Sequence, residues 1–157
     1  MSAKRSAGLL VYRFGASGEP EVLIAHMGGP FWARKDAAAW SIPKGELDES
    51  EEPQAAAMRE FEEELGLAPP SGDLLDLGEV RQSGGKLVTV WAVAGDVDPD
   101  AVVPGTFLLE WPPRSGRMQE VPEVDRVGWF DLGTAAEKLV KGQVPFLGRL
   151  REALADQ

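Results

Sequence analysis

The sequence predicts an α/β fold in which helices cover both faces of a mixed β-sheet. Segments of strand length and strand composition are interspersed with three segments of helical pattern, an order typical of layered α/β domains. The chain has 157 residues, of which 43% are hydrophobic and 27% are charged, as in ordinary globular domains. No repeat or linker divides the chain, so residues 1–157 are expected to form a single domain.

The first strands are predicted from residues rich in β-branched and aromatic side chains. Residues 7–14 (AGLLVYRF) and 21–26 (EVLIAH) flank the turn-forming sequence GASGEP and therefore predict a β-hairpin. A loop is expected over 28–39. It leads into a short extended segment at 40–43 (WSIP), which delivers Lys44 to the next part of the chain.

The second half of the chain predicts a further set of strands, loops and helices. Residues 74–82 and 86–95 are expected to be strands joined by the hairpin signal Ser83-Gly84-Gly85. An irregular loop is expected at 96–105, then a strand or the wall of a binding loop at 106–111, then a polar, basic and mobile loop at 112–120. A strand at 124–130 follows. A helix capped by Asp131 or Thr134 is expected to end near Lys141, and a last helix lies within 143–155.

The stretch from Gly45 to Leu67 (GELDESEEPQAAAMREFEEELGL) is the most informative part of the sequence. Pro53 suits the first turn of a helix, where a missing N–H costs nothing. Gly66 suits the left-handed position that follows the last turn. The stretch therefore predicts a loop over 45–52 and a helix over 53–65.

Three carboxylates share one face of this predicted helix. Residues three and four apart are neighbours on a helix surface, so Glu60, Glu63 and Glu64 are expected to converge. Like charges at this distance destabilise one another unless a positive group lies between them. Arg59 can offset part of the repulsion by pairing with Glu63, and a hard divalent cation can offset the rest, because Mg²⁺ and Mn²⁺ prefer oxygen ligands. The alternative is a solvated acidic helix face.

The spacing around these glutamates matches a longer pattern. Gly45 is followed after five residues by Glu51, and after seven more by Arg-Glu-apolar-x-Glu-Glu-x-Gly-apolar at 59–67. This pattern resembles the Nudix box of the Nudix hydrolase family, and every fixed position of that box is filled. The resemblance implies Mg²⁺-dependent hydrolysis of a nucleoside diphosphate linked to another moiety, with Mn²⁺ as the alternative metal. It also implies an α/β/α sandwich with a catalytic loop–helix–loop motif.

The resemblance further implies roles for individual residues of the motif. Glu60, Glu63 and Glu64 are the expected metal ligands, and one of them is expected to act as general base as well. Arg59 is expected to orient Glu63, and Glu51 is expected to hold the loop against the helix. These roles make Arg59 and Glu51 supporting residues rather than ligands.

A further carboxylate from a distant loop often joins such sites in the family as a ligand or base. Glu120 and Glu123, just before the last predicted strand, are the candidates here, and Glu123 is preferred. The alternative is that both side chains face solvent.

Cations near the motif are expected to bind the phosphates of a substrate. Lys44 directly precedes Gly45, so its ammonium group is expected at the mouth of the site. Lys86 and Arg117 are further candidates for phosphate contacts, as is Arg114. For each of these cations the alternative is a solvated side chain.

Tryptophans are candidates for stacking on a nucleobase, although most tryptophans in small domains belong to the core. Trp40 is expected to be a core residue, and both interpretations remain open for Trp32 and Trp111. His26 is the only histidine and lies in or at the end of an apolar strand, so it is predicted to be structural.

Composition excludes several classes of function. The chain has no cysteine, so it has no disulfide, thiolate metal site or cysteine nucleophile. The net charge of −10 argues against broad nucleic-acid binding but is compatible with a small polyphosphate held through Mg²⁺. No apolar stretch approaches the length of a membrane span, and the N-terminal apolar run is too short for a signal peptide. A cytoplasmic monomer or homodimer with no membrane contact is expected.

The expected substrate is a dinucleoside polyphosphate or a nucleoside triphosphate. The sequence Trp-Ser-Ile-Pro-Lys-Gly at 40–45 is similar to that of the diadenosine polyphosphate hydrolase branch and of related predicted nucleoside triphosphate pyrophosphohydrolases. An ADP-ribose or nucleotide-sugar pyrophosphatase and a sanitiser of oxidised nucleotides remain alternatives. A non-catalytic nucleotide-binding module is a further alternative from another class, disfavoured because the box keeps all its carboxylates. Specificity is expected to lie in loops 28–39 and 105–119.

Overall fold

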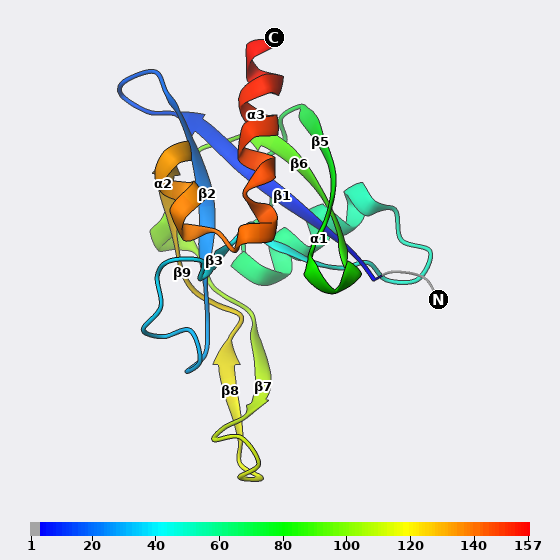
Figure 1. Cartoon of the computed structure of the whole chain (residues 1–157), viewed down its shortest axis with the longest axis vertical. Coiled ribbons are helices and arrows are strands. Elements are labelled where there is room, and N and C mark those ends of the chain that lie inside the picture. The colour runs from blue at the N-terminus through cyan, green and yellow to red at the C-terminus, as the bar shows by residue number, and fades with distance from the viewer. Residues whose placement is uncertain (1–3) are drawn as a thin grey trace.

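A mixed β-sheet and three helices form the body of the protein in the computed structural model, which describes residues 4–157 (Figure 1). The strands are β1 (Arg5–Phe14), β2 (Pro20–Met27), β3 (Trp40–Ser41), β4 (Lys44–Glu46), β5 (Leu74–Arg81), β6 (Leu87–Ala94), β7 (Thr106–Glu110), β8 (Met118–Pro122) and β9 (Val124–Asp131). The helices are α1 (Pro53–Leu65), α2 (Leu132–Lys138) and α3 (Pro145–Ala155), with 3₁₀ turns at Ser83–Gly85, Pro99–Ala101 and Lys141–Gln143.

The main sheet brings β4 and its neighbours into the middle of the molecule. Its strand order is β3-β2-β1-β6-β5, with β4 also paired to β1 and β9 also paired to β2. The pair β1–β6 is parallel, and the other pairs are antiparallel. Strand β1 pairs with β2 at Tyr12–Phe14 but with β4 at Ser6–Gly8, so the two long strands diverge. The segment from β3 to β4 occupies the space between them and carries Lys44.

Alternating side chains of β1 belong to two separate apolar layers, as expected for a strand covered on both faces. Leu10 and Tyr12 pack in the layer that contains residues of α2 and α3. Leu9 and Val11 pack in the layer that contains Phe61 and Leu65 of α1. The helices therefore cover both faces of the sheet, which confirms the predicted α/β/α sandwich.

Helix α1 has the bounds that the sequence predicts. Pro53 occupies its first turn, and Gly66 follows its last turn with φ of 68°. The Gly66 N–H donates to the Glu62 carbonyl and so satisfies one of the free carbonyls at the end of the helix. A residue with a side chain would be strained in this left-handed conformation. The helix is thus ended by its own sequence.

The most visible difference from the prediction is a second, two-stranded sheet. Residues 112–120 were expected to form a loop, but β8 begins at Met118 and pairs with β7 to make a hairpin that projects from the body (Figure 1). The sequence of this segment does not alternate between apolar and polar residues, so only the pairing with β7 identifies the strand.

Several boundaries also differ by a few residues. Lys44–Glu46, expected as extended entry and loop, pairs with β1 as β4, because the partner strand is almost forty residues earlier in the chain. Helix α2 ends at Lys138 rather than near Lys141, and α3 begins at Pro145. The Asp131 carboxylate caps α2 by accepting a hydrogen bond of 2.7 Å from the Thr134 N–H, as predicted.

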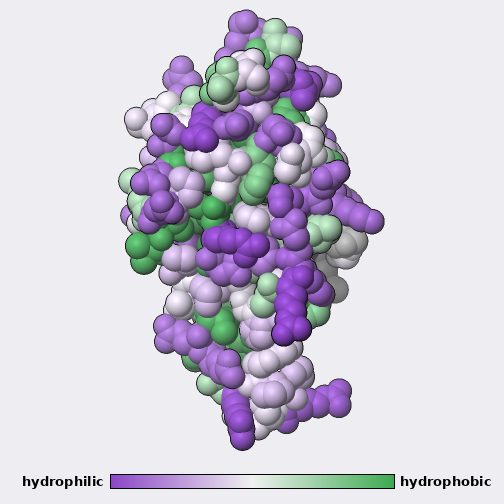
Figure 2. All heavy atoms as spheres, turned by 90° about the vertical axis from the view of Figure 1, so that its left-hand side faces the viewer, coloured by the Kyte–Doolittle hydropathy of each residue, from purple (hydrophilic) through white to green (hydrophobic). Residues whose placement is uncertain are grey.

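The surface is largely hydrophilic on the side shown in Figure 2, where apolar residues form separate patches. Exposed large apolar side chains include Phe107, Leu108 and Met118 on the projecting hairpin and Phe31 in the loop after β2. No helix within residues 4–157 is long and apolar enough to cross a membrane.

Candidate active site

Arg59 is the centre of an ion-pair network that ties the loop before α1 to the helix. Its Nε and Nη2 atoms each lie 2.8 Å from an oxygen of Glu51, and Nη2 also donates to the Glu46 carbonyl. Its Nη1 atom lies 2.9 Å from Glu60 and 3.0 Å from Glu63. Hydrogen bonds from Arg59 lower the pKa of Glu51 to about 2. The network therefore holds the loop on α1 and orients two glutamates, as the sequence indicated for Glu51 and Arg59.

Glu60 lies against the backbone of β4 at Gly45. A Cβ atom at position 45 would overlap the Glu60 carboxylate, so only glycine leaves room for it. The Glu60 side chain is 15% exposed, and burial raises the pKa of its carboxyl, with Arg59 opposing and Glu63 adding to the rise. The close approach of helix and strand thus places Glu60 in a confined position.

Glu64 is the most deeply placed glutamate of the group. One of its carboxylate oxygens accepts a hydrogen bond of 2.8 Å from the Lys44 backbone N–H. Burial raises the pKa of Glu64 to about 8, and the charges of Glu123 and Glu60 add to the rise while the Lys44 N–H opposes it. A positive charge placed beside this carboxylate would therefore stabilise its ionised form.

Glu123 is brought to the same region by the root of the hairpin. Its N–H donates to the Gly105 carbonyl at 2.8 Å, and its carbonyl accepts from the Gly28 N–H at 3.0 Å. Gly105 in turn donates to the Glu64 carbonyl at the end of α1. Burial, then the charge of Glu63, raises the pKa of the Glu123 carboxyl. Backbone contacts on both sides thus fix Glu123 next to the helix glutamates.

Glu120, the other candidate from the sequence, lies on β8 and points elsewhere. It is exposed, and its carboxylate accepts a hydrogen bond of 2.8 Å from the Thr106 hydroxyl on β7. The structure therefore brings Glu123, and not Glu120, toward the glutamates of α1.

The donor chemistry of this region fits a hard divalent cation. All four carboxylates, from Glu60, Glu63, Glu64 and Glu123, offer oxygen atoms, the ligand type that Mg²⁺ and Mn²⁺ prefer. Burial raises the pKa of Glu60, Glu64 and Glu123, and the charges of neighbouring glutamates add to the rise. Within residues 4–157, no three acidic or histidine side chains enclose a cation as they stand. In this arrangement Glu60 and Glu63 are bonded to Arg59, and Glu64 is bonded to the Lys44 N–H.

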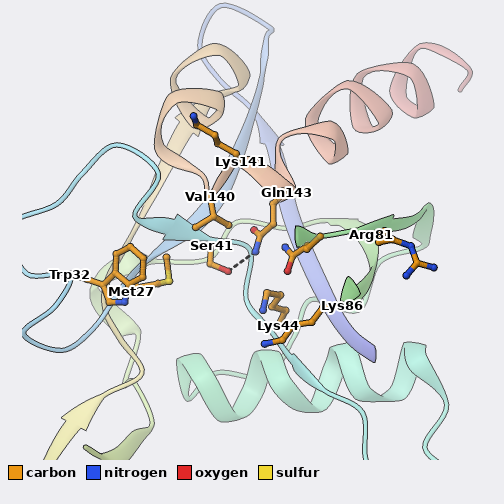
Figure 3. A pocket seen from close by; sticks show the side chains of 11 residues that line it. Met27, Trp32, Ser41, Lys44, Arg81, Lys86, Val140, Lys141 and Gln143 are labelled. Atoms are coloured by element: carbon orange, nitrogen blue, oxygen red, sulfur yellow. Dashed lines mark hydrogen bonds between the residues drawn. The ribbon is translucent and has the colours of Figure 1, made fainter. Parts of the chain in front are cut away.

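A pocket of about 740 Å³ is lined by Lys44, the residue whose backbone N–H binds Glu64 (Figure 3). Met27 and Trp32 form one side of it, and Lys44 and Lys86 approach each other near α1. Burial lowers the pKa of Lys44, and the charge of Lys86 lowers it further while Glu64 opposes. Neither ammonium group has an ion-pair partner within the described part of the chain, so the pair suits an anion.

Lys44 joins the two halves of the site. Its side chain lines the pocket, while its backbone N–H holds Glu64. Gln143 supports this segment from the opposite side: it is fully buried, accepts from the Ile42 N–H at 2.8 Å and donates to the Ser41 hydroxyl at 3.0 Å (Figure 3). The chain between β3 and β4 is therefore held rigidly where it enters the site.

Apart from Trp32, Lys44 and Lys86, the residues that line the pocket were not expected from the sequence. Arg81 and Lys141 line it, although their side chains extend away from the Lys44–Lys86 pair in Figure 3, and Gln143 forms part of its wall. The predicted hairpin could have suggested Arg81, because that residue pairs with Leu87 next to Lys86. No local signal marks Lys141 or Gln143.

The remaining candidates lie elsewhere. Arg117 and Trp111 belong to the projecting β7–β8 hairpin, and the residues that line the pocket, among those described, do not include them. Trp40 is 3% exposed and belongs to the core, as predicted. His26 is fully buried, with Nδ1 at 2.9 Å from Asp125 and Nε2 at 2.6 Å from the Lys35 carbonyl, which confirms its structural role.

Fold and site together define a class of α/β/α proteins that carry an acidic loop–helix–loop motif beside a cation-lined pocket. The sequence profile of the NUDIX domain matches residues 3–150. The chain therefore belongs to the Nudix family, which confirms the resemblance of the 45–67 motif.

Known proteins place the chain among varied members of this family. An RNA pyrophosphohydrolase of Alkalilimnicola ehrlichii is 39% identical over 56 residues, which span 34% of this chain and 31% of that protein. An Ap4A hydrolase of C. elegans in a binary complex superposes with a TM-score of 0.67 at 21% identity, covering 99% of this chain and 100% of that one. The NUDIX domain of Shewanella oneidensis NrtR complexed with ADP ribose gives 0.66 at 16% identity, covering 98% and 90%. The two superpositions show a shared fold.

Proposed function

We propose that this Nudix protein hydrolyses a phosphoanhydride bond in a nucleoside polyphosphate, with a divalent metal bound by the glutamates of α1. The observation that carries the proposal is the double role of Lys44. Its side chain lies in the pocket near Lys86, and its backbone N–H holds Glu64. Phosphates bound between the two lysines would therefore lie next to the carboxylates.

The proposed role of each residue follows from its position in the site. Lys44 and Lys86 bind phosphate oxygens as point charges. Glu60, Glu63 and Glu64 would hold Mg²⁺, or Mn²⁺ in its place, and Glu123 would add a fourth carboxylate from the hairpin root. A bound cation would neutralise the phosphoryl oxygens and lower the pKa of the attacking water.

Arg59 contributes by fixing the geometry of the ligands. Its guanidinium group bonds Glu60 and Glu63 on α1 and Glu51 in the preceding loop, so these oxygens are positioned before substrate arrives. Positioning of charged groups before the reaction is a main source of catalysis in phosphoryl transfer.

Within this reaction class we propose a dinucleoside polyphosphate or a nucleoside triphosphate as substrate. The Trp-Ser-Ile-Pro-Lys-Gly segment at 40–45 supports this choice, as does the pair of Lys44 and Lys86 in the pocket of a chain of net charge −10. ADP-ribose, nucleotide sugars and oxidised nucleotides are the alternatives. The non-catalytic alternative has less support, because all the carboxylates of the motif are present.

The test is a hydrolysis panel in Mg²⁺ and in EDTA. Diadenosine polyphosphates, nucleoside triphosphates, oxidised nucleotides, ADP-ribose and nucleotide sugars are each incubated with the protein, and released phosphate and nucleotide are measured. Mg²⁺-dependent cleavage of the first two groups is the expected result. Preference for ADP-ribose or a nucleotide sugar would keep the reaction class and overturn the substrate, and no turnover on any compound would overturn the proposal.

A further inference from the structure

We infer that the Met27–Trp32 side of the pocket is a nucleobase site, in which Trp32 makes the protein select nucleotides over other phosphate chains. The inference rests on the proposed function, because it takes the Lys44–Lys86 pair as the phosphate site. It specifies the orientation of the bound substrate, with the base at Trp32 and the phosphates extending toward α1.

The two ends of the pocket have different chemistry. Met27 and Trp32 lie together at one side, and the ammonium groups of Lys44 and Lys86 lie at another (Figure 3). An aromatic ring and a thioether suit the flat face of a base, whereas the ammonium groups suit phosphate. A volume of about 740 Å³ is within the range of pockets that hold nucleotide-sized ligands. A molecule with a base at one end and phosphates at the other matches this arrangement.

Trp32 is held in place before any ligand binds. Its ring contacts Phe31 edge-on, with the ring centroids 4.9 Å apart, and packs against the core layer of α2 and α3, while its backbone N–H donates to the Gly29 carbonyl. Its carbonyl accepts from the Lys35 N–H at 2.9 Å, and the Lys35 ammonium group lies over the Phe31 ring. The turn therefore presents Trp32 on a local scaffold of its own neighbours.

The loop that carries Trp32 is also fixed to the body of the protein. The buried His26 ring lies 2.6 Å from the Lys35 carbonyl, so it holds the loop three residues after Trp32. Asp36 accepts hydrogen bonds from the Lys138 ammonium group on α2 and from the Trp40 indole N–H. A site ordered in this way loses little conformational entropy when a base stacks on it.

Trp111, the other tryptophan with an undecided role, is the natural comparison. It lies just after β7 on the projecting hairpin and is partly exposed like Trp32, but only Trp32 is among the residues that line the pocket. Replacement of Trp111 therefore controls for the general effect of removing a partly exposed indole.

Binding measured against two ligands with the same number of phosphates tests the inference. Calorimetry in Mg²⁺ compares ATP, GTP, CTP and UTP with inorganic tripolyphosphate, in the wild type and in a Glu64→Gln background that slows turnover. We expect at least one nucleotide to bind about 10-fold more tightly than tripolyphosphate, since base stacking on an aromatic side chain contributes roughly 1–3 kcal/mol. Trp32→Ala should reduce this ratio to near one without weakening tripolyphosphate, and Trp32→Phe should restore most of it.

The outcomes separate the inference from the proposed function. A preference for nucleotides that survives in Trp32→Ala, or that is lost in Trp111→Ala instead, would overturn the base site. Equal affinity of the wild type for tripolyphosphate and all four nucleotides would overturn it as well. Because the ratio is an equilibrium quantity, it can be read even if no nucleotide is hydrolysed, and hydrolysis can persist where the ratio shows no base site.

Discussion

The acidic motif around α1 and the pocket beside it are built in different ways. In the motif, the polar contacts join residues close in sequence: Arg59 is eight residues from Glu51, and Lys44 is twenty from Glu64. In the pocket and its supporting loop, Asp36 binds Lys138 across 102 residues. Apart from Glu123, the chemical groups are thus carried by one short segment, whereas the shape that receives the substrate exists only after the whole chain has folded.

This difference suggests that the two regions control different kinetic quantities. Groups that act on charge developing in the transition state change kcat, whereas groups that bind substrate and transition state equally change KM. The motif is expected to govern the first and the pocket the second. The following predictions test this division, beginning with the largest effect.

Glu64→Gln is expected to reduce turnover by about 100-fold or more, because it removes a charged ligand from the centre of the motif. The measurement is the steady-state rate in Mg²⁺, with circular dichroism as a check on folding. Glu62→Gln is the matched control, since Glu62 is an exposed glutamate two residues away on the same helix. Near-normal turnover in a folded Glu64→Gln protein would remove Glu64 from the machinery.

Lys86→Met is expected to raise KM about 10-fold and to change kcat much less, because a charged hydrogen bond to phosphate contributes roughly 1.5–3 kcal/mol. Full Michaelis curves measure the two constants separately. Arg151→Met provides a control, as this cation lies on α3 with an exposed side chain. A fall in kcat at constant KM would mean that the pocket takes part in the chemistry and that the proposed division is wrong.

Glu123→Gln is expected to raise the Mg²⁺ concentration for half-maximal rate several-fold, because one of four carboxylates loses its charge. Activity is titrated with Mg²⁺ at saturating substrate. Glu120→Gln is the comparison, since that residue sits on β8 with its carboxylate bonded to Thr106. If Glu120→Gln shifts the titration and Glu123→Gln does not, Glu120 rather than Glu123 is the additional metal ligand.

The smallest expected effect is on the stability of the metal-free protein. The pKa of Glu64 is about 8 in the folded state and near its ordinary value of 4.5 when unfolded. The folded state therefore holds this proton more tightly, and its stability falls as pH rises from 4.5 to 8. We expect Glu64→Gln to melt a few degrees higher than the wild type at pH 8.5 in EDTA, and at a similar temperature at pH 5. Parallel melting curves across this range would contradict the raised pKa.

The same division explains how much could be predicted from the sequence. Helix α1, its two ends and the facing of Glu60, Glu63 and Glu64 depend on spacings of three or four residues and on Pro53 and Gly66, so the sequence predicts them directly. The role of Glu51 follows from the same short segment. These features need no knowledge of the rest of the fold.

The parts that could not be predicted depend on distant partners. Strand β8 exists because β7 pairs with it, and its own residues carry no apolar alternation. Gln143 supports Ser41 and Ile42 from 101 or 102 residues away, and its sequence neighbourhood suggests only a helix. The sequence gives no reason to choose between Trp32 and Trp111 as a base-stacking residue, whereas in the structure only Trp32 is among the residues that line the pocket. The general rule is that contacts across the sheet and its connections decide which polar residues share a site.

Gly45 shows how the motif restricts future change. The Glu60 carboxylate lies where a Cβ atom would be at position 45, so every other amino acid there would displace a candidate metal ligand. Active clones from a library that randomises position 45 are therefore expected to carry glycine. Gly28 is restricted in the same way, since a Cβ atom there would overlap the Pro122 carbonyl, but Trp32 lies outside both restrictions. Substitutions at Trp32 can therefore alter the ligand that the pocket accepts while Gly45 and Glu60 keep their contact.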